Sequence, residues 1–217
     1  MHHSILDQPY SLNQSQIDFY KKNAFIKLKE VLDCDTIAYY NRVISTKVDE
    51  LNQQSIPLEK RDTYGKAFLQ LFNLWREDPQ IQTLIFSKRL AQLSADLMEV
   101  EGVRLYHDQA LFKEAGGGIT PWHADQYYWP LATSKTITAW IPLQATPLEM
   151  GPLEFSAGSQ QVLTGRELSI SDTSENVIEK NLRVNDFPHI IEAFDLGEVS
   201  FHHNLNFHTA SRNRTNR

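Results

Sequence analysis

The chain has 217 residues, of which 41% are hydrophobic and 22% are charged, a composition typical of a folded globular protein. It argues against long disordered segments, and the formal net charge of -6 argues against a broadly basic surface for nucleic acid or membranes. No apolar run reaches the about 18 residues that a transmembrane helix requires. With one cysteine, Cys34, and no apolar leader, we expect a cytoplasmic protein that forms a single domain over residues 1–217.

The first hundred residues are predicted to form a mostly helical layer. Ser11 matches the capping residue of a short helix, which is followed by an apolar strand at residues 25–28. Either Asp33 or Asp35 can cap the next helix, in which apolar residues recur at helical spacing. A further helical pattern covers residues 81–98.

The remaining residues, 101–217, are predicted to form a β core. Alternating polar and apolar residues, β-branched residues and frequent turn signals are typical of a sandwich or a double-sheet jelly roll. Residues 161–184 are polar and show no clear period, so we expect a long excursion over the mouth of the barrel. The fold class is therefore mainly β with an α-helical N-terminal layer. The predicted strands or strand–turn units cover residues 103–113, 135–144, 151–159, 189–196 and 198–208.

A histidine and an aspartate, His123 and Asp125, lie two residues apart in a segment that reads as extended. Side chains two apart on a strand point to the same face, so this pair can aim at one point. One imidazole and one carboxylate are two of the three ligands in the facial triad that holds non-haem Fe(II). The alternative is a hydrogen-bonded pair on a surface strand. A third ligand is available downstream, where residues 197–217 contain three histidines: His202, His203 and His208.

Five segments, taken in order, resemble the phytanoyl-CoA dioxygenase family of Fe(II)- and 2-oxoglutarate-dependent oxygenases, which are built on a double-stranded β-helix. The resemblance covers most of the chain, and its order is more specific than any one segment. Ala24 stands where the family more often has glycine, and Met150, Ala157 and Gln160 depart from the family's turn. The segments are "SLNQSQIDFYKKNAFIKLKEVL", "YHDQALFKEAGGGITPWHADQYYWP", "TAWIPLQ", "MGPLEFSAGSQ" and "GEVSFHHNLNFHTASRNRT".

The resemblance implies that His123, Asp125 and His208 bind Fe(II), with 2-oxoglutarate and dioxygen filling the three positions that remain free. It also implies hydroxylation and not halogenation, because relatives that halogenate have a small residue in place of the aspartate. His202 matches a family histidine that is not normally a ligand, so we expect it to be packed or to support the site. His203 is expected to point to the opposite face, His107 is expected to be structural or pocket-lining, and His189 carries no signal.

The far carboxylate of 2-oxoglutarate is expected to pair with an arginine, which presents a planar bidentate donor. In the family this arginine follows the distal histidine by roughly nine to eleven residues. Arg217 is the candidate, while Arg212 and Arg214 are expected to lie in a solvated turn. The family continues into a final core strand after this turn, so we expect that this strand is missing from the sequence or lost.

Further pocket residues follow from strand parity and from the resemblance. Gln109 is placed near the cosubstrate, although an exposed strand face is an equal alternative. Trp140 and Thr138 share a face and match the cosubstrate pocket, although a buried core tryptophan is the simpler interpretation. The expected substrate-pocket residues are Lys113, Tyr127, Tyr128 and Trp129, although aromatic residues on a strand more often simply pack.

The leading hypothesis is a dioxygenase that hydroxylates an unactivated carbon of a small metabolite or acyl compound and releases succinate and CO2. One alternative is a catalytically silent jelly-roll binding domain of the same fold. Another is a same-fold oxidase that performs desaturation, cyclisation or epimerisation. The expected partner is a small-molecule substrate, with no nucleic acid and no membrane, and the sequence indicates neither the substrate nor the oligomeric state.

Overall fold

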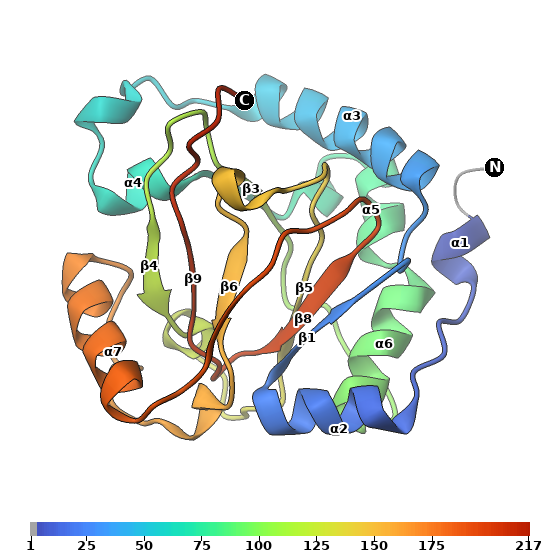
Figure 1. The fold of residues 1–217 in the computed structure, drawn as a ribbon. Coiled ribbons are helices and arrows are strands. Elements are labelled where there is room, and N and C mark those ends of the chain that lie inside the picture. Colours follow the sequence, from blue (N-terminus) through green and yellow to red (C-terminus); the bar gives the residue numbers. More distant parts are fainter. Residues whose placement is uncertain (1–3) are drawn as a thin grey trace.

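The computed structural model describes residues 4–217, in which two antiparallel sheets lie against each other with helices around them (Figure 1). His2 and His3 lie outside the described residues. The helices are α1 (Ser4–Asp7), α2 (Gln14–Asn23), α3 (Cys34–Leu51), α4 (Thr63–Ala67), α5 (Pro79–Ile85), α6 (Lys88–Met98) and α7 (Asp172–Val184). The strands are β1 (Phe25–Leu28), β2 (Leu69–Phe72), β3 (Gln109–Phe112), β4 (Thr120–His123), β5 (Ile137–Trp140), β6 (Leu153–Ser156), β7 (His189–Ile191), β8 (Val199–His203) and β9 (His208–Ala210).

The two main sheets are assembled from strands that lie far apart in the sequence. One sheet has the order β1-β8-β5 and the other has the order β4-β9-β6-β7, while β2 and β3 form a separate pair. Every one of these pairings is antiparallel. The β-rich part of the chain therefore has the double-sheet arrangement that its short strands predict. Among residues 4–217, no helix is both long enough and apolar enough to cross a membrane.

The β1-β8-β5 sheet has two different faces because successive side chains on a strand alternate. Phe201 of β8 and Leu28 of β1 point away from the other sheet and join the main hydrophobic cluster. On the opposite face, Phe25 stacks on Phe155 of the second sheet, with ring centroids 4.4 Å apart. The inner face of β8 also carries His202, whose ring centroid lies 5.6 Å from that of Phe155.

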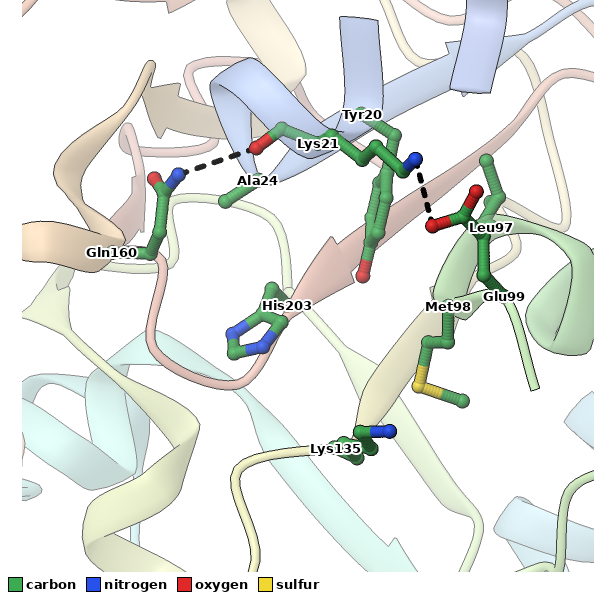
Figure 2. Close-up of a pocket in the computed structure, with 9 residues that line it drawn as sticks. All are labelled: Tyr20, Lys21, Ala24, Leu97, Met98, Glu99, Lys135, Gln160 and His203. Carbon is green, nitrogen blue, oxygen red and sulfur yellow. Dashed lines mark hydrogen bonds and ion pairs between the residues drawn. The ribbon is translucent and has the colours of Figure 1, made fainter. Parts of the chain in front are cut away.

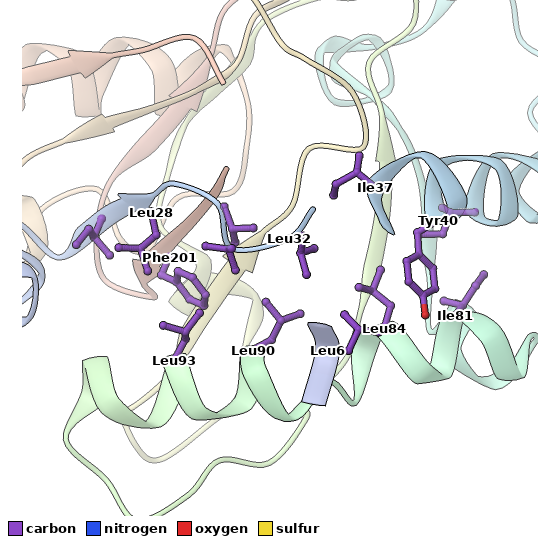
Figure 3. Close-up of a cluster of buried hydrophobic side chains, with 14 of the residues drawn as sticks. Leu6, Leu28, Leu32, Ile37, Tyr40, Ile81, Leu84, Leu90, Leu93 and Phe201 are labelled. Carbon is purple, nitrogen blue, oxygen red and sulfur yellow. The ribbon is translucent and has the colours of Figure 1, made fainter. Parts of the chain in front are cut away.

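The main hydrophobic cluster joins α1, α3, α5 and α6 to the outer face of the β1-β8-β5 sheet (Figure 3). Leu93 of α6 lies next to Leu28 and Phe201, and Tyr40 of α3 lies next to Ile81 of α5 (Figure 3). All five side chains are at most 1% exposed. Burying each leucine or phenylalanine contributes about 1.5–3 kcal/mol to folding, so this cluster anchors the helices on the sheet.

The helix starts in the first hundred residues differ in detail from the prediction. Asn13, not Ser11, caps α2, because its side chain accepts from the backbone N of Gln16, whose side chain in turn accepts from the backbone N of Asn13. Asp33, and not Asp35, caps α3. The segment 81–98 contains two helices, which separate at Phe86 and Ser87, where the Ser87 side chain caps α6.

The predicted excursion at residues 161–184 contains α7, which is a correction to the expected irregular segment. The helix begins at a capping box formed by Ser171 and Ser174. Its apolar side is narrow, because Ile178 and Leu182 are its only apolar residues in the cluster with Trp122 and Phe207. Two apolar residues four apart among polar neighbours are too few to reveal a helical period in the sequence.

The strands are shorter than the predicted segments. Of residues 103–113, only Gln109–Phe112 form a strand, and this strand pairs with β2, which the sequence did not predict. Residues 198–208 form two strands and not one, because a turn at 204–207 separates β8 from β9. This turn lets His202 and His208 approach the same point from different sheets.

Candidate metal centre

His123 and Asp125 lie where β4 ends and a 3₁₀ turn, η3 (Asp125–Tyr128), begins. Ala124 between them is extended, with φ of -122° and ψ of 135°, so the two side chains emerge on the same side as predicted. Asp125 itself lies in the turn and not on a strand. Across the sheet, His123 pairs directly with His208 of β9, and their ring centroids are 4.1 Å apart.

The three side chains present one ligand atom each within 4.8 Å of one another. Asp125 Oδ1 lies 4.0 Å from His123 Nε2 and 3.6 Å from His208 Nε2. One ion can bridge both gaps, because a metal bond to nitrogen or oxygen is about 2.1 Å long and two such bonds span about 4.2 Å. Two imidazoles and one carboxylate on one side of an ion are the donor set of the Fe(II) facial triad. The geometry and the donor chemistry therefore fit a metal ion.

Both histidines are oriented by backbone carbonyls. His123 Nδ1 donates to the Pro121 carbonyl at 2.8 Å, and His208 Nδ1 donates to the Asn206 carbonyl at 3.0 Å. A carbonyl oxygen only accepts, so Nδ1 carries the proton and Nε2 keeps its lone pair for a metal. Burial lowers the pKa of both imidazoles, and although Asp125 raises it in part, the net shift is downward and favours the neutral rings.

The two oxygens of Asp125 have different surroundings. Oδ1 faces His123 and His208, whereas Oδ2 accepts from Thr138 Oγ1 at 2.9 Å and lies 3.2 Å from His202 Nε2. Burial alone would raise the pKa of this carboxyl, but His208, His202 and His123 together lower the pKa below its ordinary value. Asp125 is thus held as a carboxylate with one oxygen anchored and the other turned toward the two imidazoles.

His202 and His203 face opposite sides of β8, as the regular strand predicts. His202 is 2% exposed, packs beside Phe155 and lies 4.4 Å from the His208 ring. It contacts Oδ2 of Asp125, the oxygen that is turned away from His123 and His208. His203 instead lines a separate cavity, which none of His123, Asp125 and His208 lines.

Of the predicted cosubstrate residues, the structure brings Thr138 to the centre but not Trp140. Trp140 lies on the same face of β5 two residues later, and it packs edge-on against Phe194 at 4.8 Å. Gln109 is exposed and contacts His107 at 2.7 Å and Gln70 at 2.5 Å. Burial lowers the pKa of His107, while the charges of Asp125 and Asp108 act in the opposite direction.

Arg217 is exposed, and its guanidinium forms no hydrogen bond or ion pair with any residue of 4–217. Arg217 therefore contacts none of the three converging side chains, and its expected pairing with the far carboxylate of 2-oxoglutarate stays a prediction. Arg212 and Arg214 are exposed too, as expected for a solvated turn. Sequence reasoning missed Asn213, which is 2% exposed and donates to the carbonyls of Lys113 and two other residues. No signal distinguishes this asparagine within the basic "RNRTNR" segment.

The predicted substrate-pocket residues divide into two groups. Tyr127 and Tyr128 are 46% and 41% exposed, and the Tyr128 hydroxyl accepts from the backbone N of Ile170. Trp129 is buried, with its ring 6.0 Å from that of His107.

Lys113 lies near the start of β4. Its Nζ donates to the Gly118 carbonyl at 2.8 Å and to Thr120 Oγ1 at 3.4 Å. Burial lowers the pKa of Lys113 to about 8, while Glu154 raises it in part. This lysine is therefore tied to the loop that leads to His123.

The chain resembles known proteins in sequence and in fold. A family model described as "Phytanoyl-CoA dioxygenase (PhyH)" matches residues 22–217. Curated protein sequences contain no match to the chain.

Several solved structures share the fold. The non-heme alpha ketoglutarate dependent carbocyclase SnoK from nogalamycin biosynthesis has a TM-score of 0.80 and 20% identity, covering 97% of this chain and 83% of that one. The epimerase SnoN, solved in complex with Fe3+ and alpha ketoglutarate, has a TM-score of 0.75 and 20% identity, covering 94% and 78%. EctD from S. alaskensis, solved with 2-oxoglutarate and 5-hydroxyectoine, has a TM-score of 0.76 and 15% identity, covering 98% and 76%.

Proposed function

Because the chain belongs to the phytanoyl-CoA dioxygenase family, we propose that it is an Fe(II)- and 2-oxoglutarate-dependent dioxygenase. His123, Asp125 and His208 would hold the iron. The observation that carries this proposal is the convergence of their ligand atoms, with Asp125 Oδ1 lying 4.0 Å and 3.6 Å from the two Nε2 atoms. A catalytically silent binding domain would have no need to keep this donor set intact.

Dioxygen would supply the oxidising power: with iron and 2-oxoglutarate bound, one oxygen atom would enter succinate as 2-oxoglutarate loses CO2, and the other would serve to remove a hydrogen atom from the substrate. The protein's part is to hold three ligands on one side of the ion, which leaves three positions open. Thr138 and His202 fix Asp125 Oδ2, so that Oδ1 stays turned toward the ion position. The backbone carbonyls of Pro121 and Asn206 fix the two imidazoles in the same way.

Hydroxylation of an unactivated carbon in a small metabolite or acyl compound is the outcome that we propose first. The carboxylate of Asp125 supports it over halogenation, because the aspartate occupies the position where a halide would bind. Cyclisation or epimerisation is the second candidate. The high structural similarity to a carbocyclase and an epimerase favours this second candidate, since one hydrogen abstraction can start all three reactions.

The roles of the surrounding residues follow from their contacts. We propose that Thr138 positions Asp125, because its hydroxyl donates to Oδ2, and that Gln109 borders the cosubstrate. Trp140 and Arg217 remain predictions for cosubstrate binding. Trp129 is proposed as the inner wall of the substrate pocket, because it is buried and packs near His107. Tyr127, Tyr128 and Lys113 remain predictions for the outer pocket.

The test is anaerobic addition of Fe(II) and 2-oxoglutarate to the protein, with detection of the weak visible charge-transfer band of the iron chelate. We expect the band in the unmodified protein and succinate release once air is admitted. His208→Ala removes one ligand and should abolish the band, whereas His203→Ala removes a histidine that faces away from Asp125 and should keep it. Absence of the band, or a band that survives His208→Ala, would refute the proposed function.

A further inference from the structure

The β2–β3 pair presents one face to the main hydrophobic cluster and the other face to the outside. Leu71 of β2 and Ala110 of β3 pack against the cluster. Because side chains alternate along a strand, Gln70 and Gln109 emerge on the opposite face, where Phe72 lies opposite Gln109. We define the β2–β3 surface as this outward face together with the side chains that contact it: Tyr64, Gln70, Phe72, Tyr106, His107 and Gln109.

A chain of hydrogen bonds between uncharged groups crosses the β2–β3 surface. The Tyr64 hydroxyl donates to Gln70 Oε1 and Gln70 Nε2 donates to Gln109 Oε1, both at 2.5 Å. Gln109 Nε2 donates to His107 Nε2 at 2.7 Å, which leaves the ring proton on Nδ1. An amide nitrogen carries two hydrogens, so Gln70 and Gln109 each keep one N–H for a ligand. Gln109 is exposed, so its free N–H is accessible.

Aromatic rings adjoin this chain of hydrogen bonds. The His107 ring lies 4.9 Å from the ring of Tyr106 and 5.8 Å from the ring of Phe72. Tyr106 is 52% exposed and Phe72 is 54% exposed, so both rings are open to a ligand. Exposed rings beside amide N–H groups suit a ligand that is itself a ring and carries hydrogen-bonding groups at its edge.

The β2–β3 surface adjoins the metal centre through Trp129. This buried side chain lies four residues after Asp125, and its ring is 6.0 Å from that of His107. Among the three candidate ligands, Asp125 has the most exposed side chain, at 18% against 8% for His123 and 4% for His208. The ion position is thus most open on the side of Asp125.

The β2–β3 surface offers no positive charge to a ligand. Within residues 4–217, no lysine or arginine forms a hydrogen bond, an ion pair or a cation–π contact with its side chains. Burial lowers the pKa of His107, and the charges that act on this ring, Asp125 and Asp108, are both negative. The separate cavity beside α2 differs, because its wall contains charged side chains, among them Lys21 and Glu99 (Figure 2).

We propose that the substrate of the dioxygenase is an uncharged ring compound that carries hydroxyl groups, and that the β2–β3 surface binds it. This inference rests on the proposed function, because it concerns the substrate of the same metal centre. The ring would stack on Tyr106, and its hydroxyl groups would accept from the free N–H groups of Gln109 and Gln70. A sugar ring and a phenolic ring share this chemistry. A carboxylate or phosphate would instead leave water without a cationic partner.

The probe is phenyl β-D-glucopyranoside, which carries both kinds of ring. It is titrated by calorimetry under argon into the full-length protein loaded with Fe(II) and 2-oxoglutarate. Phenyl β-D-glucuronide is the matched anion, since it differs only by a carboxylate in place of one CH2OH group. We expect saturable binding of the glucoside and at least about tenfold weaker binding of the glucuronide. Methyl β-D-glucopyranoside and phloroglucinol each supply one of the two rings, and the tighter binder identifies the ring that the surface selects.

Variants locate the binding. Gln70→Leu breaks the chain of hydrogen bonds and Tyr106→Ala removes an exposed ring, so each should weaken glucoside binding by about fivefold. The matched controls are Gln14→Leu and Phe19→Ala, which change an exposed amide and a 44% exposed ring on α2 and should leave binding unchanged. Because Tyr106 is 52% exposed, Tyr106→Ala should keep the thermal midpoint of the parent.

The charge-transfer band is recorded in each sample, which separates this inference from the proposed function. Absence of the band in the parent protein refutes the proposed function and this inference with it. If the band is present, three results overturn this inference alone: no saturable glucoside binding, equal affinity for the glucuronide, or equal affinities in the variants and their controls.

Discussion

Asp125 is the residue on which the metal centre depends most, because its two oxygens carry separate tasks. Thr138 and His202 occupy Oδ2, and the imidazoles of His123 and His208 lie around Oδ1. Partners that orient a metal-binding side chain contribute to metal affinity although they never touch the ion. The anchoring of Oδ2 is therefore part of the metal centre.

Thr138→Val tests this anchoring, because it removes the hydroxyl that donates to Oδ2 and keeps the β-branched shape. We expect the affinity for Fe(II) to fall by about tenfold, as is typical when an outer partner is lost. Anaerobic Fe(II) titration of the 2-oxoglutarate chelate band measures it. Thr83→Val is the matched control, since the Thr83 hydroxyl donates to the Pro79 carbonyl on an exposed face of α5. Equal Fe(II) affinities in the two variants would show that Oδ2 needs no donor from Thr138.

At the scale of elements, α7 packs on the four-stranded sheet that carries the metal ligands and supports the end of β4. Ile178 and Leu182 of α7 pack on Trp122, the residue before His123. Glu175 of the same helix accepts from the backbone N of Trp122 at 2.8 Å. The helix thus holds the end of β4 from which His123 projects.

Ser171→Ala removes the side chain that caps α7 and accepts from the backbone N of Ser174. Loss of such a cap costs about 1 kcal/mol, so the free energy of unfolding should fall by about that amount. Urea unfolding followed by circular dichroism measures it. Ser169→Ala, at an exposed serine that caps no helix, should change stability by less than about 0.5 kcal/mol. A similar loss in both variants would contradict the capping role.

The sequence predicts elements best where one strong periodicity acts alone. The strand at residues 25–28 and the helix after Asp33 are confirmed, because each carries a continuous apolar pattern. The helix α7 was missed, since only Ile178 and Leu182 bury its apolar side. Capping was misplaced at α2, because Ser11 and Asn13 both suit a helix start and only the fold selects between them.

The same limit applies to the candidate site. His123, Asp125 and His208 could be named from the resemblance, and the structure brings them together. The residues that anchor Asp125 could not be predicted in the same way, because the pairing of β5 with β8 places Thr138 opposite His202 and the sequence does not reveal this pairing. Asn213 could not be found at all, because its role depends on carbonyls that lie about a hundred residues earlier in the chain.

For the whole molecule, the contact between the two main sheets brings the metal ligands together with the side chains that anchor Asp125. Asp125 and His208 belong to the β4-β9 side, whereas His202 and Thr138 belong to the β1-β8-β5 sheet. Phe25 and Phe155 stack across the interface, and the Phe155 ring also lies beside those of His202 and His208. Packing of the sheets therefore completes the centre, because it brings Thr138 and His202 to Asp125.

Phe155→Ala leaves a cavity at this interface and should lower the free energy of unfolding by about 3 kcal/mol. Chemical denaturation measures the loss, and Phe155→Leu should recover most of it by refilling the space. Leu163→Ala, at a side chain that is 77% exposed, should stay within about 0.5 kcal/mol of the parent. A loss in Phe155→Ala no larger than in Leu163→Ala would show that this stack does not hold the sheets together.

His202 and His203 are adjacent in β8, so an insertion or deletion that shifts the register of this strand would exchange one histidine for the other. If β8 slipped by one residue, every side chain would exchange faces, and His203 would replace His202 beside Asp125. The metal centre would still meet an imidazole, but Phe201 would leave the helix side of the sheet and turn toward the metal centre. The metal centre alone therefore does not select the correct register of β8. The apolar residues of β8 select it, because only the correct register buries them against the helices.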